Sequence, residues 1–122
     1  MDENNQNSKQ YDLEKRTFLF AKRVRSFVKK LPKTLANIED SRQLVDASGS
    51  VGANYIEANE ALSKKDFVMR AKISRKEVKE SGYWLKLVDT SEDQILEQER
   101  TDLVKEASEL THIFGAIVTK SK

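Results

Sequence analysis

Apolar residues recur at helical spacing along most of the chain. A 4-3-4-3-4 spacing places one set on a single face of a first helix, and Pro32 ends the pattern because the residue before a proline is disfavoured in the α region. A second set predicts the core stripe of the next helix. The first set is Leu13, Thr17, Phe20, Val24, Phe27 and Leu31, and the second is Ile38, Val45, Gly49, Gly52 and Ile56.

Two more helices follow, each preceded by a start signal. "SKKD" (63–66) and "SEDQ" (91–94) have the spacing of capping boxes. The helix after the first box carries Phe67, Ala71, Ser74, Val78, Ser81, Leu85 and Val88 on one face, and the helix after the second carries Leu96, Leu103, Ala107, Leu110, Phe114 and Ile117. The expected helices span about 11–31, 38–62, 64–88 and 92–119. Short links between long helices favour an all-α, antiparallel up-down-up-down four-helix bundle over residues 11–120, after a flexible polar tail over 1–10.

Composition supports this prediction and excludes several classes of site. The 122 residues suffice for one domain, and one proline and four glycines leave few breaks between helices. The absence of cysteine excludes disulfides, cysteine zinc sites and a thiol nucleophile, and fits the cytoplasm. The start "MDENNQNSKQ" lacks the apolar region of a secretion signal, and no apolar run is long enough to span a membrane. We therefore expect a cytoplasmic protein with no membrane partner.

Charge is nearly balanced overall, at +2, but unevenly distributed. Residues 11–33 carry eight Lys or Arg and two acidic side chains, whereas residues 92–109 carry seven acidic and two basic ones. Residues 34–91 have nine of each sign. The basic and acidic segments can attract each other within or between chains, or the basic one can meet an acidic partner.

The basic segment places two columns of cations opposite its apolar stripe. They are Lys15, Lys22 and Lys29, and beside them Arg16, Arg23 and Lys30. Such columns can follow a phosphate backbone, or they can be a solvated face or one paired with the acidic fourth helix. No aromatic residue interleaves with these cations for base stacking. Any nucleic-acid binding is therefore expected to tolerate sequence and to weaken with salt, since phosphate contacts carry no sequence information.

The glycines fall inside helical patterns, where each costs about 1 kcal/mol relative to alanine. "GSVG" (49–52) lacks the ending of a P-loop and the spacing of a dinucleotide fingerprint, and no strand precedes it. We therefore interpret Gly49, Gly52 and Gly82 as packing positions. Gly49 and Gly52 would form the smooth side of the second helix, where another helix or a large aromatic comes close.

Carboxylates on a second face of the third helix offer another candidate site. Ile73, Glu77, Glu80, Trp84 and Leu87 repeat one residue behind the core heptad, and Ser50, Asn54, Glu57 and Ala61 form a similar flank on the second helix. Glu57, Glu77 and Glu80 could serve as metal ligands or as an acid–base set. Alternatively they hydrogen-bond across helices or subunits, with Asn54, Tyr83 or the Trp84 N–H as partners. Trp84 and Tyr55 are candidate interface anchors.

The single histidine argues against catalysis at these carboxylates. His112 does not form the Glu-x-x-His spacing of dimetal bundles, and one histidine without cysteine gives no legible nucleophile–base–acid arrangement. We expect no catalytic residue, no metal and no cofactor.

Three stretches resemble one known family. They are "SVGANYIEA" (50–58), "SKKDF" (63–67) and "ISRKEVKESGYWLKLV" (73–88). They resemble the four-helix-bundle proteins of the 23S rRNA intervening-sequence family. The matching positions are Gly52, Ala53, Asn54, Tyr55, Glu57, Ala58, Phe67, Lys76, Glu77, Glu80, Tyr83, Trp84 and Leu85.

The resemblance implies a left-handed antiparallel bundle that assembles into a homo-oligomer, a barrel-like pentamer. Some bacterial relatives are encoded inside insertions in ribosomal RNA genes. A similar bundle is the accessory protein of diversity-generating retroelements, where a basic pentamer engages nucleic acid and a reverse transcriptase. The family as a whole has no agreed biochemical activity.

Two functions remain open from the sequence. The first is a non-enzymatic, homo-oligomeric bundle that binds RNA or DNA without sequence specificity through the basic face of the first helix. The alternative is a protein–protein scaffold or adaptor, for example for a reverse transcriptase, with no nucleic-acid binding of its own. A third possibility, an enzyme, has little support in the residues.

Overall fold

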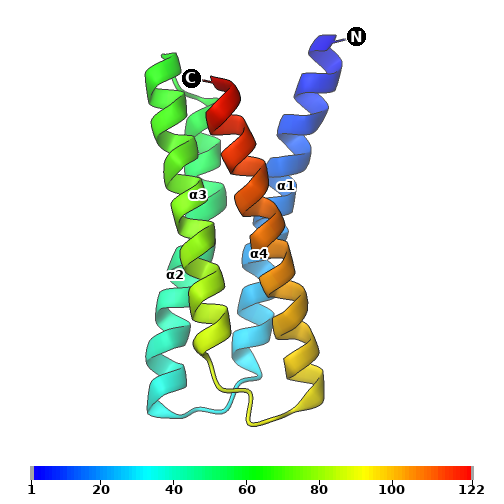
Figure 1. Cartoon of the computed structure of the whole chain (residues 1–122), viewed down its shortest axis with the longest axis vertical. Coiled ribbons are helices and arrows are strands. Elements are labelled where there is room, and N and C mark those ends of the chain that lie inside the picture. Colours follow the sequence, from blue (N-terminus) through cyan, green and yellow to red (C-terminus); the bar gives the residue numbers. More distant parts are fainter. Residues whose placement is uncertain (1, 122) are drawn as a thin grey trace.

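The computed structural model describes residues 2–121, and the side chains of residues 12–121. The chain forms four helices, α1 (Asp2–Lys29), α2 (Leu35–Asn59), α3 (Lys64–Leu87) and α4 (Gln94–Ser121), and the described residues contain no strand. The helices run alternately down and up the long axis, and each packs on its neighbours in the chain, with α4 closing against α1 (Figure 1). This confirms the predicted all-α antiparallel four-helix bundle.

The helix bounds differ from the expected ones mainly at α1. Its helix begins at Asp2, well ahead of the expected start near residue 11. No proline or glycine interrupts residues 2–29. The prediction that residues 1–10 are mobile falls on Met1 and on residues whose side chains lie outside the described part of the structure, and it stays a prediction.

Side-chain caps fix the starts of α2 and α3. The Thr34 hydroxyl accepts the N–H of Asn37 at 3.1 Å, and the Ser63 hydroxyl accepts the N–H of Asp66 at 3.1 Å. Each cap satisfies a backbone donor that the first turn of a helix leaves without a partner. Ser63 is thus the N-cap that its sequence motif predicted.

The expected capping box at residues 91–94 is wrong. Ser91 and Glu92 have φ values of 56° and 62°, in the left-handed region, so they form a turn rather than a helix entry. Asp89 supports that turn by accepting the Ser91 N–H at 2.8 Å. The cap lies further along, at Asp93, whose carboxylate accepts the N–H of Leu96 at 3.0 Å.

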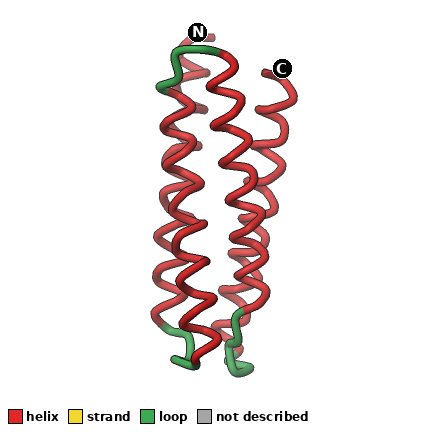
Figure 2. The backbone as a smooth tube through the Cα atoms, turned by 90° about the vertical axis from the view of Figure 1, so that its left-hand side faces the viewer, coloured by secondary structure: helices red, strands yellow, loops and turns green. Residues whose placement is uncertain are grey.

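Three short loops join the helices, and two of them meet at one end of the bundle (Figure 2). The buried Asn37 side chain ties these two together. Its Nδ2 donates to the carbonyl oxygens of Pro32, at 3.0 Å, and Asp89, at 2.8 Å. Its Oδ1 accepts the Asp89 N–H at 2.9 Å. One amide therefore links the α1–α2 loop to the α3–α4 loop.

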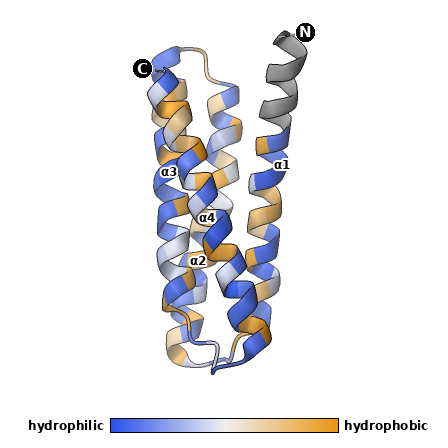
Figure 3. Cartoon of the chain, turned by 45° about the vertical axis from the view of Figure 1, so that its right-hand side comes forward, coloured by the Kyte–Doolittle hydropathy of each residue, from blue (hydrophilic) through white to orange (hydrophobic). Residues whose placement is uncertain are grey.

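The predicted core stripes of α1, α3 and α4 are largely confirmed, and hydropathy alternates along these helices as their faces turn inward and outward (Figure 3). All six positions predicted for the first helix are buried, and the last of them, Leu31, lies just after the end of α1. On α3 the stripe from Ala71 to Val88 is buried, while Phe67 is only half-buried. On α4 the last buried position is Val118, and Ile117 packs at the edge of the core.

The predicted core stripe of α2 is wrong by one position. Ile38 and Ile56 are 44% and 49% exposed, and the buried residues lie one step earlier in the chain, at Asn37, Leu44, Ser48, Val51 and Tyr55. One residue along a helix is a rotation of about 100°. The core takes the side of α2 that carries Leu44, Val51 and Tyr55.

The two glycines of α2 turn towards α1 instead. A Cβ on Gly52 would lie 2.9 Å from Thr17 Oγ1, and one on Gly49 would lie 3.1 Å from an Arg25 guanidinium nitrogen. Gly82 is different, since a Cβ there would make only an ordinary 3.8 Å contact with Ala107. The close approach at Gly52 therefore comes from a buried threonine of α1 and not from an aromatic side chain.

Candidate nucleic-acid interface

The Arg16, Arg23 and Lys30 column of α1 faces α4. The Arg16 guanidinium donates two hydrogen bonds to the Glu106 carboxylate, at 2.7 and 2.8 Å, and lies 3.6 Å from Glu109. One end of the same column is paired too, with Lys30 Nζ 2.5 Å from Glu99. A parallel pair of N–H···O bonds is the strong form of such contacts.

The pKa shifts at this contact between α1 and α4 follow from the ion pairs. The hydrogen bond from Arg16 holds the pKa of Glu106 below its ordinary value, with smaller contributions from the charges of Arg16 and Arg23. The same hydrogen bond raises the pKa of Arg16. Arg23 and Lys30 line a surface hollow of ≈ 330 Å³ together with Glu99 and Asp102. The acidic helix thus pairs with two of the three cations of this column within one chain, as one of the alternatives from the sequence anticipated.

The Lys15, Lys22 and Lys29 column lies on the outer face of α1, and all three side chains are exposed. Their spacing of seven residues corresponds to about 10 Å between neighbours along the helix. None of the three forms an ion pair within 4.0 Å among the described residues. Together with Arg23 and Arg25, these are the exposed cations of α1 that form no ion pair among the described residues.

An exposed aromatic side chain stands in this lysine column, contrary to the expectation that none would. Phe18 is 61% exposed, and Lys22 Nζ lies 5.8 Å from the centre of its ring. Phe18 follows Lys15 by three residues and precedes Lys22 by four, so all three share one face. Helical spacing alone places Phe18 on the face of these lysines.

The second candidate site, on the flank shared by α2 and α3, shows carboxylates without a metal-binding arrangement. Burial, together with the neighbouring Glu80, raises the pKa of Glu77, while Glu57 is exposed on α2. Asn54 accepts a hydrogen bond from Arg70 at 3.1 Å and donates one to the Ser50 carbonyl at 2.9 Å. Across residues 12–121 no group of three or more metal-ligating side chains comes together.

The aromatic residues of this flank divide between surface and core. Trp84 is half-buried against the core with its Nε1 enclosed and without a hydrogen-bond partner, and the exposed Tyr83 packs edge-on to it, with ring centres 5.0 Å apart. Tyr55, expected as an interface anchor, is instead a core residue. It is 5% exposed, its ring meets Phe114 edge-on at 5.5 Å, and burial raises its pKa.

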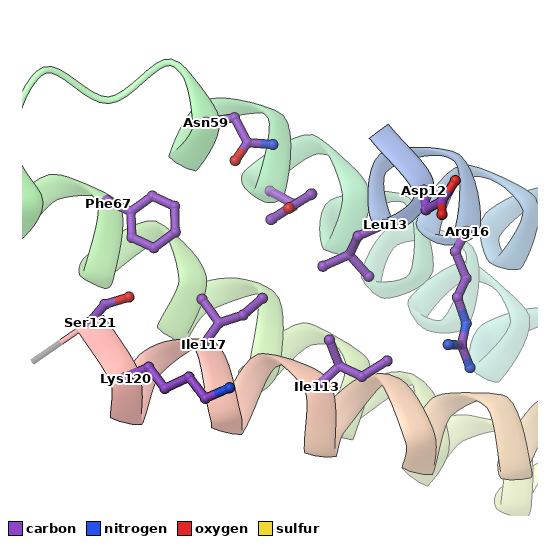
Figure 4. Close-up of a pocket in the computed structure, with 10 residues that line it drawn as sticks. Asp12, Leu13, Arg16, Asn59, Phe67, Ile113, Ile117, Lys120 and Ser121 are labelled. Carbon is purple, nitrogen blue, oxygen red and sulfur yellow. The ribbon is translucent and has the colours of Figure 1, made fainter. Parts of the chain in front are cut away.

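An apolar hollow of ≈ 670 Å³ opens between α1 and α4 at the end of the bundle near the C-terminus. Leu13, Phe67, Ile113 and Ile117 project into it (Figure 4). Its lining includes no histidine. His112 is exposed and its Nδ1 lies 2.9 Å from the Ser108 carbonyl oxygen of its own helix.

The sequence profile of the family described as 23S rRNA-intervening sequence protein matches residues 9–116, which include most of all four helices. This chain belongs to the 23S rRNA-intervening sequence protein family. The crystal structure of a protein with unknown function from the S23 ribosomal protein family of Bacteroides thetaiotaomicron VPI-5482 is similar to it. The two superpose with a TM-score of 0.75 and 28% sequence identity, over 86% of this chain and 96% of the other. No curated protein matches this chain at a significant level.

In this member of the 23S rRNA-intervening sequence protein family, the charged residues predicted on the first helix lie on two different faces. Of the six predicted cations, Arg16 and Lys30 are paired with α4, Arg23 is exposed between them without an ion pair among the described residues, and the other three face outward. Within residues 2–121, no helix combines the length and the apolar character that crossing a membrane requires. The outer face of α1 presents three exposed lysines together with Phe18.

Proposed function

We propose that this family member is a non-enzymatic, homo-oligomeric bundle that binds RNA or DNA through Lys15, Lys22 and Lys29. The observation that carries the proposal is the exposure of these three lysines in one column, with Phe18 among them. Phosphate contacts from such a column would give affinity without sequence preference. Of the six cations that the sequence suggested, the proposal keeps the outer three.

Assembly of several copies, with five as the number that the family resemblance implies, would repeat the lysine column around a common axis. Large apolar side chains exposed on several helices support association. Leu19 is 45% exposed, Leu35 77% and Ile95 73%. Exposed apolar side chains that gather into patches mark sites of association between proteins. We place the assembly in the cytoplasm, in keeping with the absence of cysteine.

The decisive experiment compares two triple variants that remove the same charge from the same helix. One replaces Lys15, Lys22 and Lys29 with Gln, and its matched control replaces Arg16, Arg23 and Lys30 with Gln. Fluorescence anisotropy of a labelled single-stranded RNA, measured over a salt series, reads affinity and the number of phosphate contacts. For single strands the slope of log K against log salt falls by about 0.7 per lost contact, so the outer triple should lose about 2 and the paired triple less than 1.

The alternative function is a scaffold for another protein that has no nucleic-acid binding of its own. The neutralisation of Arg16 and Lys30 by α4 favours it, because a chain selected only for phosphate binding has no need to mask its cations. If neither RNA nor DNA is retained by the wild-type protein at low salt, the nucleic-acid proposal fails and the scaffold remains.

A further inference from the structure

The outer face of α3 is also strongly basic, although the equal numbers of acidic and basic residues over 34–91 do not show it. α3 carries eight Lys or Arg and three acidic residues, whereas α2 carries four acidic residues and one Arg. Together they produce the even balance over residues 34–91. Taken by itself, α3 carries as many Lys and Arg residues as the basic segment 11–33, with one more acidic residue.

Four of the α3 lysines form a continuous column. Lys65, Lys72, Lys79 and Lys86 are each seven residues apart, and all four are exposed. The column extends about 30 Å along the helix. Lys76 is exposed beside it. The buried stripe of α3 lies on the opposite side of the helix, so the lysines project away from the bundle.

The neighbouring helices do not neutralise the positive charge of this lysine column. The α4 carboxylates Glu99 and Glu106 are committed to α1, and the ion pairs of the described residues include none of the five α3 lysines. The contact of α3 with α4 runs instead through small residues, with Gly82 beside Ala107. The three acidic residues of α3 itself, Asp66, Glu77 and Glu80, are all half-buried.

An exposed aromatic ring completes the face. Tyr83 is 60% exposed, and it lies four residues after Lys79 and three before Lys86, which places it among the lysines. Its ring packs edge-on against Trp84, with 81° between the planes, and Trp84 in turn packs against the core. Tyr83 is therefore held on a rigid support with its outer side open to solvent.

We propose that this α3 face is a second nucleic-acid surface, and that it binds single strands. The lysines would contact successive phosphates while Tyr83 stacks on an unpaired base. Stacking of that kind requires a base with a free face, which a duplex does not offer along its length. The arrangement goes beyond the proposed α1 surface, because α1 and α3 do not touch and occupy diagonal positions in the bundle. One copy can then hold two strands on opposite sides.

The test uses Tyr83→Ala, Tyr83→Trp and a variant with Lys65, Lys72, Lys79 and Lys86 replaced by Gln. Met69→Ala is the matched control, since Met69 is an exposed apolar residue of the same helix. Binding is measured by fluorescence anisotropy with a labelled single strand, the corresponding duplex, and a single strand made of abasic residues. Size exclusion with light scattering monitors the assembly of every variant.

Tyr83→Ala should bind the normal single strand about 5- to 140-fold more weakly, and Tyr83→Trp should retain the wild-type affinity. Binding to the abasic strand and to the duplex should not change with Tyr83→Ala. The lysine variant should lower the salt slope for the single strand by about 3. Met69→Ala should match the wild type in every measurement.

Each contrary result has a distinct meaning. If the α3 variants bind as the wild type does while the outer α1 variant loses affinity, the α3 inference is overturned and the proposed function stands. The reverse result keeps the α3 surface and removes α1 as the interface. If Tyr83→Ala dissociates the assembly, the face is a contact between copies and the inference fails. Retention of an acidic protein but of no polynucleotide also overturns it.

Discussion

Gly52 of α2 lies so close to α1 that a Cβ on it would stand 2.9 Å from Oγ1 of Thr17. Thr17 cannot easily retreat, since it is fully buried and its hydroxyl donates to backbone carbonyls of its own helix, with the Leu13 and Glu14 oxygens each 2.9 Å away. Overpacking of this kind costs about 1–3 kcal/mol. Alanine in place of glycine returns about 1 kcal/mol of helix propensity. We expect Gly52→Ala to destabilise the bundle by about 1 kcal/mol in chemical denaturation.

Gly115→Ala is the control for that experiment. A Cβ at Gly115 meets nothing within 4 Å, so only the propensity gain applies and the variant should be more stable than the wild type by about 0.5–1 kcal/mol. Thr17→Ala combined with Gly52→Ala should cost less than the sum of the two single changes, because the hydroxyl in the way is gone. If Gly52→Ala gains stability as Gly115→Ala does, α1 and α2 are not in close contact here.

The Arg16–Glu106 pair should make the stability of the fold depend on pH in the acid range. Because Arg16 lowers the pKa of Glu106 in the folded chain, the pair stabilises the fold above the ordinary pKa of a glutamate, and this contribution is lost as pH falls through the lowered value. Glu106→Gln should remove that part of the pH dependence, and at neutral pH it should cost about 1 kcal/mol. Free energies of unfolding from pH 7 to pH 3 measure the effect. The exposed loop residue Glu92, changed to Gln, should leave the profile unchanged.

Glu77 should make stability depend on pH in the opposite direction from Glu106. Burial and Glu80 raise its pKa, so the folded chain holds this proton more tightly than the unfolded chain does. Stability from this group is present in acid and is lost as pH rises through the window between the ordinary and the raised pKa. Glu77→Gln should therefore be more stable than the wild type at pH 7, with the advantage disappearing in acid, whereas the exposed Glu57→Gln should change neither. An advantage that is equal at every pH would show that titration of Glu77 is not its cause.

The sequence was sufficient for the fold and for three of the four core stripes, because α1, α3 and α4 each have one apolar stripe at heptad-like spacing. α2 has two, one residue apart. One contains Ile38 and Ile56 with the two glycines, and the other contains Leu44, Val51 and Tyr55. Periodicity alone does not choose between stripes 100° apart on the same helix. The choice depends on which side α1 and α3 approach, and that is a property of the assembled bundle.

Which charged residues are paired and which are free was harder to predict from the sequence, for a similar reason. The pairing of Arg16 with Glu106 joins residues 90 positions apart, and only the closure of α4 against α1 brings them together. Counts over long segments also mixed the acidic α2 with the basic α3 and hid the lysine column of α3. Phe18 and Tyr83 follow directly from helical spacing, and they become informative only once their exposure is known.

Asn37 gives the last prediction, because one side chain holds two loops. Its Nδ2 and Oδ1 make three hydrogen bonds to Pro32 and Asp89, and Asn37 itself is 2% exposed. Asn37→Leu would leave those backbone groups without partners, at about 1–3 kcal/mol for each group that stays buried. We expect a loss of about 2–4 kcal/mol in denaturant unfolding, with the exposed Gln43→Leu on the same helix close to neutral.

Asn37→Asp separates hydrogen bonding from size. A carboxylate still accepts the Asp89 N–H, but it cannot donate, and it places its charge beside the carbonyl oxygens of Pro32 and Asp89. This variant should be at least as destabilised as Asn37→Leu at neutral pH. Below the pKa of the new carboxyl it should recover part of the loss, since the protonated group donates one hydrogen bond. If Asn37→Asp is as stable as the wild type at pH 7, the two loops are held by contacts other than this amide.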